Sequence, residues 1–202
     1  MNGGMNQTAG GYTLVEVILA LGLSLFTLSL LYSIYVRELQ SQQVREDILD
    51  AQQRARVVMD LISRELLMAG YDPAGLNRDT NPSNDFWGVS LVSNGLQIQS
   101  DINGNGLLND SHETILFSHD LSTHTLRRNT GGGNQPFAED IESFQVRLLN
   151  QGGTQTMLPV EVRAVELVVT ARTNKPDLQY PQNGGFRTVT LQAQVAPRNL
   201  GL

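Results

Sequence analysis

An apolar segment near the start of the chain constrains the fold more than any other feature. From Tyr12 to Val36 the only charged residue is Glu16, and the next one is Arg37. In a helix that rises about 1.5 Å per residue, about 20 apolar residues span a hydrocarbon core of about 30 Å. The sequence therefore predicts a membrane-length helix over residues 12–36. A carboxyl group there costs roughly 2.5–3.5 kcal/mol on insertion scales, so we expect Glu16 to have a partner or a function.

The next residues keep a helical period but become amphipathic. No proline or glycine interrupts residues 37–69, and Gly70 followed by Pro73 is a typical helix stop. Apolar side chains recur at steps of three and four on one face: Val44, Ile48, Ala51, Ala55, Val58, Ile62 and Leu66. We expect residues 37–70 to continue the first helix and to pack its apolar stripe against a head domain. A coiled coil is the alternative interpretation of the stripe.

The remainder of the chain, residues 71–202, predicts a β-rich globular head. Residues 71–87 are rich in Asn, Asp and Pro and indicate a loop. After Gly88 the period changes to two, and strands are expected at residues 96–99, 114–118, 123–128, 141–148, 160–171 and 186–196. Several strands after one long helix favour an α+β fold, in which an antiparallel sheet packs on the helix.

Composition excludes several classes of function. The 202 residues carry a net charge of −6 and contain no cysteine. A disulfide framework, a thiolate zinc site and a cysteine nucleophile are therefore excluded. No basic patch suggests binding to nucleic acid. We expect the protein not to be an enzyme, because no motif with nucleophile spacing is present.

Two weaker motifs are interpreted as structural. The glycine-rich segment 130–136 lacks the lysine that a phosphate-binding loop requires, and we expect a flexible loop there. His112, His119 and His124 lie in or beside a predicted hairpin. We expect them to be exposed turn residues, and a zinc site is the alternative.

The segment 101–113 is the most specific polar motif after the apolar helix. Its sequence, DINGNGLLNDSHE, places oxygen-bearing side chains at alternate positions with glycine at the sixth. This spacing is typical of the first half of a calcium loop, because Ca²⁺ takes six to eight oxygen ligands. The twelfth position is a histidine, so the segment is not an EF-hand. We expect Ca²⁺ to be bound by Asp101, Asn103, Asn105, Asp110 and Glu113, with the carbonyl group of Leu107. A turn without an ion is the alternative, since Asn and Gly also favour turns.

The residues GYTLVE (11–16) and the apolar segment behind them resemble the processing site of type IV pilins and pseudopilins. The text RARVVMDLISRELLMAGYDPAG (54–75) is similar to PilW-type minor pilins and to J-type minor pseudopilins of type II secretion. The resemblance implies a type IV pilin-like fold and a prepilin leader, residues 1–11. Prepilin peptidase would cut between Gly11 and Tyr12, and the new N-terminus at Tyr12 would be methylated. Glu16 would then contact the freed amine of Tyr12 in a neighbouring subunit.

The same resemblance implies a place in the cell and a set of partners. The helix would anchor the chain in the inner membrane, with the head in the periplasm, and would later pack with major and minor pilins in a filament at the cell surface. The positive-inside rule alone would place the side that carries Arg37 in the cytoplasm, but we give the resemblance of the processing site precedence over that rule. The expected role is to initiate or cap the assembly of type IV pili, which serve adhesion, motility and DNA uptake. The alternatives are a minor pseudopilin of type II secretion and a signal-anchored, calcium-binding surface protein that never polymerises.

Overall fold

The computed structural model describes residues 10–200, so residues 1–9 of the predicted leader lie outside the described part of the chain. The chain forms two compact units, with the boundary between Arg45 and Glu46. One helix, α1 (Leu14–Met68), contributes residues to both units. The strands all follow this helix and are antiparallel. The predicted α+β fold class, with one long N-terminal helix and antiparallel β-structure, is confirmed.

Helix α1 ends where the sequence predicts. Gly70 follows with a φ of 74°, in the left-handed region that glycine adopts without strain. Its N–H group donates a hydrogen bond of 2.9 Å to the carbonyl oxygen of Gln99. The chain then enters the predicted loop, which contains one short 3-10 helix, η1 (Leu76–Arg78). The hydrogen bond of Gly70 connects the end of the helix to Gln99, which is the last residue of a strand in the head.

One face of the C-terminal part of α1 is buried in the head. The buried residues on this face are Ala51, Ala55, Val58, Met59, Ile62 and Leu66. All but Met59 belong to the stripe that the sequence predicts. Leu49 and Val57 lie on the same stretch of helix but are exposed. The amphipathic interpretation of this stretch is therefore confirmed for the residues from Ala51 onward.

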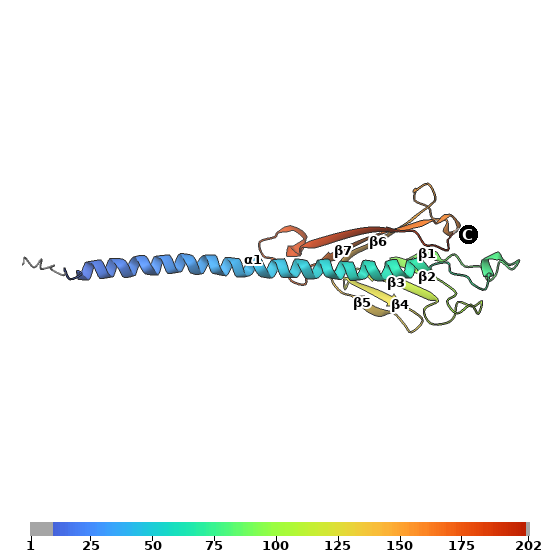
Figure 1. Ribbon diagram of the computed structural model, residues 1–202, viewed down its shortest axis with the longest axis horizontal. Helices are drawn as coiled ribbons and strands as arrows, with labels where there is room; N and C mark the ends of the chain where they lie inside the picture. Colours follow the sequence, from blue (N-terminus) through green and yellow to red (C-terminus); the bar gives the residue numbers. More distant parts are fainter. Residues whose placement is uncertain (1–9, 201–202) are drawn as a thin grey trace, which may run out of the picture. The chain divides into compact units, whose positions relative to one another are not determined.

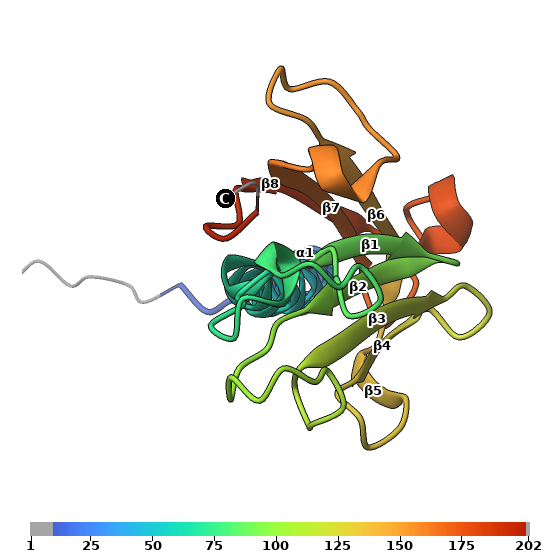
Figure 2. The same ribbon diagram turned by 90° about the vertical axis from the view of Figure 1, so that its right-hand side faces the viewer.

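Two sheets form the rest of the head. The first has five strands in sequence order: β1 (Val89–Val92), β2 (Gly95–Gln99), β3 (Thr114–Asp120), β4 (Thr125–Asn129) and β5 (Gln135–Ala138). The second has three: β6 (Ile141–Leu149), β7 (Ala164–Arg172) and β8 (Thr188–Val195). Figure 2 shows the sheets side by side around α1. Buried residues of both sheets and of the helix form one hydrophobic core, which includes Ile62, Phe117 and Leu167.

The structure corrects four details of the strand prediction. The expected strand 160–171 begins only at Ala164, because Pro159 starts a short 3-10 helix, η2 (Pro159–Glu161). Strand β5 occupies the end of the segment expected to be a flexible loop. Strand β1 was not predicted, and the strands divide into two sheets where one was expected.

The expectation that all three histidines are exposed turn residues is wrong for His119. This residue lies within β3, on the same face as Ile115 and Phe117, and is 5% exposed. Its Nε2 atom lies 2.8 Å from the carbonyl oxygen of Ile141, the first residue of β6. His119 therefore links the two sheets. His112 is exposed, and His124 lies half-buried in the turn that follows β3.

Candidate functional site

The described N-terminal residues show how the apolar helix begins. Residues 10–13 have no regular structure, and both Gly11 and Tyr12 of the predicted cleavage site are exposed. The hydroxyl group of Thr13 accepts a hydrogen bond of 3.3 Å from the N–H group of Glu16. The carboxylate of Glu16 accepts one of 3.3 Å from the N–H group of Thr13. This reciprocal pair is a capping box, which satisfies free N–H groups at a helix start.

The capping box gives Glu16 a local structural role that the sequence analysis missed. The pattern of Thr followed three residues later by Glu, directly before an apolar segment, was the available signal. An acid in the first turn also interacts favourably with the helix dipole. Among the described residues, no basic side chain pairs with Glu16. The exposed carboxylate therefore stays available to a group outside the chain.

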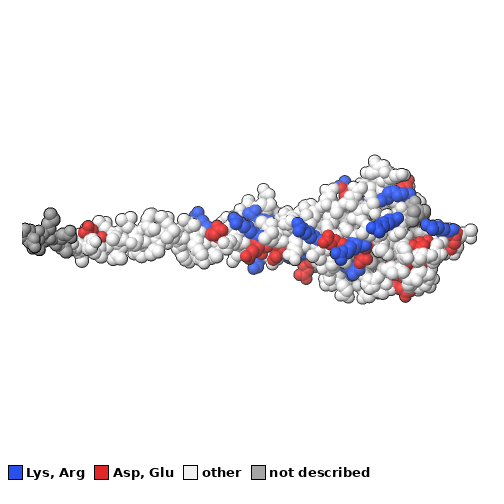
Figure 3. Space-filling model, viewed as in Figure 1, with Lys and Arg blue, Asp and Glu red and all other residues white. Residues whose placement is uncertain are grey.

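The surface of α1 behind Glu16 is apolar and exposed. Figure 3 shows a long stretch of helix surface without charged side chains. Three of its hydroxyl groups are satisfied within the helix, because those of Ser24, Thr27 and Ser33 donate to carbonyl oxygens three or four residues earlier, at 2.7–2.9 Å. By length and composition, α1 contains a segment that can cross a membrane. Such a surface suits contact with lipid or with other apolar helices.

The structure brings the residues of the segment 101–113 together in one loop between β2 and β3. Asp101 is fully buried, and its carboxylate accepts hydrogen bonds from the N–H groups of Gly104 and Gly106, at 2.8 and 3.1 Å. Glu113 is also buried, and its carboxylate accepts bonds from the N–H groups of Asp110 and Asn103, at 3.0 and 3.5 Å. The two buried acids therefore fix the backbone of the loop from its two ends.

The exposed members of the loop converge on Asp110. The amide groups of Asn103 and Asn105 both donate to one carboxylate oxygen of Asp110, each at 2.8 Å. The side-chain oxygen of Asn105 accepts a bond of 2.8 Å from the N–H group of Leu107, whose side chain is exposed. Five of the six predicted ligands thus hydrogen-bond to one another directly or through the backbone of the loop.

The loop has the kind of oxygen ligands that a hard cation prefers, although its carboxylate and amide oxygens accept hydrogen bonds from N–H groups in this structure. Three acids lie within 13 residues, and two of them are buried. Within residues 10–200, no basic side chain pairs with any of the three. Carboxylate and amide oxygens are the ligands that Ca²⁺ prefers. In the described part of the chain, however, no three acids or histidines are grouped to hold a metal ion.

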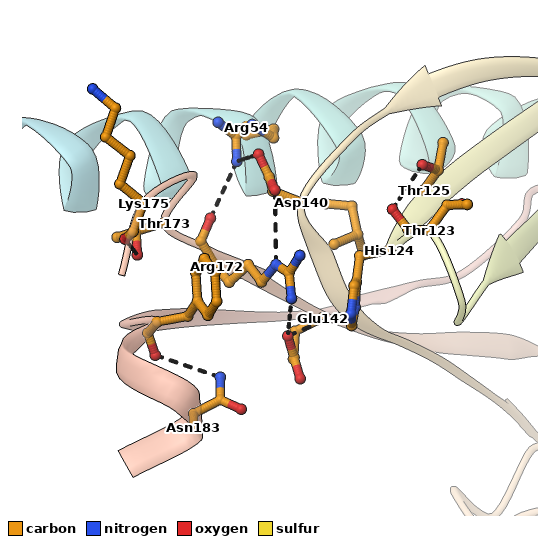
Figure 4. A network of polar contacts seen from close by, with 12 residues as sticks. Arg54, Thr123, His124, Thr125, Asp140, Glu142, Arg172, Thr173, Lys175 and Asn183 are labelled. Carbon is orange, nitrogen blue, oxygen red and sulfur yellow. Dashed lines mark hydrogen bonds and ion pairs between the residues drawn. The ribbon is translucent and has the colours of Figure 1, made fainter. Parts of the chain in front are cut away.

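A second polar cluster joins α1 to both sheets (Figure 4). Arg54 on α1 donates to the carbonyl oxygen of Arg172 at 3.1 Å and lies 3.3 Å from the carboxylate of Asp140, in the turn between β5 and β6. Arg172 lies 3.7 Å from Asp140 and 3.6 Å from Glu142. The guanidinium group of Arg172 also lies 4.5 Å from the centre of the Phe186 ring.

The cluster balances its own charges, so it favours a structural role. The two arginines face two acids, and His124 lies 3.8 Å from Glu142. The connection between the two sheets passes through Asp140, whose positive φ of 56° is one that non-glycine residues seldom adopt. We interpret the cluster as the contact that fixes this connection against α1. Sequence reasoning could not find it, because its members are far apart in the chain.

Two other features of the head offer little chemistry. A cavity of about 330 Å³ is lined by Trp87, Val160, Leu200 and other side chains, with Asp85 and Arg163 as its charged members. No described side chain in its lining is a serine, threonine, histidine, cysteine or lysine, so the described lining offers no hydroxyl, imidazole, thiol or amine nucleophile. In the turn after β3, the hydroxyl group of Ser122 donates a hydrogen bond of 2.6 Å to the carboxylate of Asp120. This bond holds the turn and lowers the pKa of Asp120 to about 2.

A comparison with solved structures found a structural similarity. No family model matches the chain, and no curated protein matches it. Among solved structures, the chain is similar to a type IV-like pilin from Thermus thermophilus, with 17% sequence identity and a TM-score of 0.42. The similarity covers 74% of this chain and 97% of the other.

Proposed function

We propose that this protein is a minor pilin of the PilW type, which prepilin peptidase processes and which helps to initiate or cap the assembly of type IV pili. The observation that carries the proposal is the segment from Gly11 to Val36. It combines the sequence GYTLVE with an exposed, uncharged helical surface of membrane length. In this account the protein acts by assembly and not by catalysis.

The proposal gives α1 two successive roles. Before assembly, the apolar part of the helix anchors the chain in the inner membrane, with the head in the periplasm. After cleavage behind Gly11, the same surface packs against the helices of other pilins in the filament. The exposed carboxylate of Glu16 then pairs with the freed amine of Tyr12 in a neighbouring subunit. In a low-dielectric filament core such a pair is favourable only when both charges are present and well placed, so it fixes the position of one subunit against the next.

The capping box supports a competing function of another class. Thr13 and Glu16 bond to each other at the start of the same helix. Glu16 would therefore cap the helix equally well in a signal-anchored protein that never polymerises. Glutamine serves at this position of a capping box as well as glutamate does, but it carries no charge. The two functions therefore differ in the effect expected for Glu16→Gln.

We expect both Glu16→Gln and Glu16→Ala to lower the amount of the protein in sheared surface filaments by at least about tenfold, the loss that removing one hydrogen-bonded charge pair implies. Membrane insertion should be unchanged, because each substitution removes a charge from an apolar segment. The control is Thr13→Ala, which weakens the cap but keeps the charge. Normal incorporation of Glu16→Gln with reduced incorporation of Glu16→Ala would assign the residue to the capping box alone.

We further propose that the loop 101–113 binds Ca²⁺ through the predicted residues Asp101, Asn103, Asn105, Asp110 and Glu113, with Leu107 contributing its carbonyl group. The support is the set of acids without basic partners, two of which are buried. The loop also packs on the end of α1, since Asp101 donates from its N–H group to the carbonyl oxygen of Tyr71 at 2.8 Å. A bound ion would therefore stabilise the helix end and the loop together.

Calcium at about 100 times its dissociation constant should stabilise the head by about 2.7 kcal/mol. For a domain of this size, that shift raises the melting temperature by about 5–10 °C. The measurement is thermal unfolding with calcium and with excess chelator, with magnesium as the control. Asp110→Asn removes an exposed charge and should abolish most of the shift. Identical melting curves in calcium and in chelator would eliminate the site.

A further inference from the structure

The outer edge of β8 has unpaired backbone groups. This strand is the last of the three-stranded sheet and pairs only with β7 (Figure 2). The N–H group of Thr173 donates to the carbonyl oxygen of Arg187 at 2.8 Å, just before β8 begins. Because hydrogen-bonded positions alternate along an antiparallel pair, every second residue from Arg187 onward faces β7. The N–H and C=O groups of Thr188, Thr190, Gln192 and Gln194 therefore point away from the sheet, and no described residue pairs with them.

The other sheet edges carry features that hinder pairing, and β8 does not. Strands β1 and β5 have four residues each, and β5 contains Pro136. Strand β6 is irregular near Ile141 and carries Glu142 and Arg147. Short strands, proline, irregularities and charges are the usual means by which proteins protect a sheet edge. The eight residues of β8, TVTLQAQV, include no charge, no proline and no glycine.

The inward face of β8 is also incompletely covered. Val189, Leu191, Ala193 and Val195 alternate toward the core but stay half-buried. Their partners on β7, which are Ala171, Val169, Leu167 and Val165, are fully buried. The core-facing side chains of β7 are therefore fully covered, whereas those of β8 remain partly exposed to solvent. One more strand beside β8 would cover these four side chains and pair the free backbone groups.

We propose that β8 pairs with β8 of a second copy of this chain, antiparallel and centred on Leu191, so that the two three-stranded sheets become one continuous sheet. In this register Leu191 lies opposite Leu191, Val189 opposite Ala193 and Thr190 opposite Gln192. Apolar side chains then meet apolar ones, and the residues with free N–H and C=O groups meet one another. A strand without charges can meet its own copy without placing like charges opposite each other. The inference does not depend on the proposed filament function.

The absence of cysteine makes the register testable in the full chain in its membrane. Leu191 would occupy a pair without mutual hydrogen bonds, where Cα atoms lie about 4.5 Å apart, which is within disulfide range. We expect Leu191→Cys to form a disulfide-linked dimer on mild oxidation. Gln135→Cys, at the exposed edge of the other sheet, is the control and should stay monomeric. Equal yields from the two variants would overturn the proposal.

A second pair of variants separates strand pairing from chance collision. Adding Thr190→Lys and Gln192→Lys to Leu191→Cys places lysines opposite lysines in the proposed register, on the polar outer face. We expect the yield of dimer to fall at least tenfold. The matched variant with Thr190→Asn and Gln192→Asn should keep the yield of Leu191→Cys. Unfolding curves confirm that each variant is folded, and cross-linking of the lysine variant at full yield would contradict the proposed pairing.

Discussion

Replacing Gly95 by alanine is expected to destabilise the head by at least about 3 kcal/mol, the range of severe overpacking. Gly95 lies in β2 and pairs with Ser118 of β3. A Cβ atom at Gly95 would overlap the carbonyl oxygen of Phe117 and lie 3.0 Å from the Cα atom of Ser118. Both contacts are backbone atoms of the neighbouring strand, so no side chain can turn aside to relieve them. Strands β2 and β3 would have to separate in the middle of the five-stranded sheet.

Thermal unfolding followed by the fluorescence of Trp87 measures this loss. Trp87 is the single tryptophan of the chain and lies in the head, so its signal reports on the unit that carries the sheets. The control is Gly132→Ala, since a Cβ atom there would meet nothing within 4 Å. We expect the control to unfold within about 2 °C of the unchanged protein. A Gly95→Ala protein that unfolds with the control would show that β2 and β3 are not paired in this register.

Replacing Ile62 by alanine is expected to cost about 2–5 kcal/mol, as is usual when a buried aliphatic side chain is cut back to alanine. Ile62 is fully buried on α1 and belongs to the core that joins the helix to both sheets. The loss corresponds to a fall of about 5–15 °C in the melting temperature of a domain of this size. The measurement is again thermal unfolding followed by the fluorescence of Trp87.

Leu49→Ala is the matched control on the same helix. Leu49 is 61% exposed, so its removal should change the free energy of unfolding by no more than about 0.5 kcal/mol. The two variants together test which face of α1 lies against the sheets. Equal destabilisation by both would mean that the helix is buried on all sides. No loss from Ile62→Ala would mean that the predicted stripe does not contact the head.

Local patterns in the sequence were sufficient for the helix and for most strands. The stop at Gly70 is a local property, because a glycine in the left-handed region ends a helix at little cost. The burial of Ile62 and Leu66 follows from the helical period alone. The capping box of Thr13 and Glu16 is equally local and could have been found from its spacing.

Features that depend on how far an element extends were harder to predict. His119 was expected in a turn, because the hairpin was predicted to turn two residues too early. Once β3 is extended to Asp120, the alternation of the strand places His119 on the buried face with Phe117. In the same way, Pro159 replaces the start of the expected strand by a 3-10 turn, which delays β7 to Ala164.

Features that depend on contacts between distant residues were not predictable from the sequence. The division into two sheets occurs at Asp140, and the contacts of this residue with Arg54 and Arg172 join segments far apart in the chain. The free edge of β8 is likewise defined by the absence of a ninth strand beside it in the described head. The predicted calcium loop, residues 101–113, was predictable only in part. Its residues gather as the spacing predicts, but their oxygens are bonded to N–H groups and to one another, which spacing cannot show.

We propose that α1 first anchors the chain in the membrane and becomes a filament helix after cleavage behind Gly11. The most direct test is mass spectrometry of the N-terminal peptide of the protein isolated from cells. The account predicts a peptide that starts at Tyr12 and carries a methylated amine. A mature protein that still carries Gly11 and the residues before it would contradict the account and favour an anchor that never polymerises.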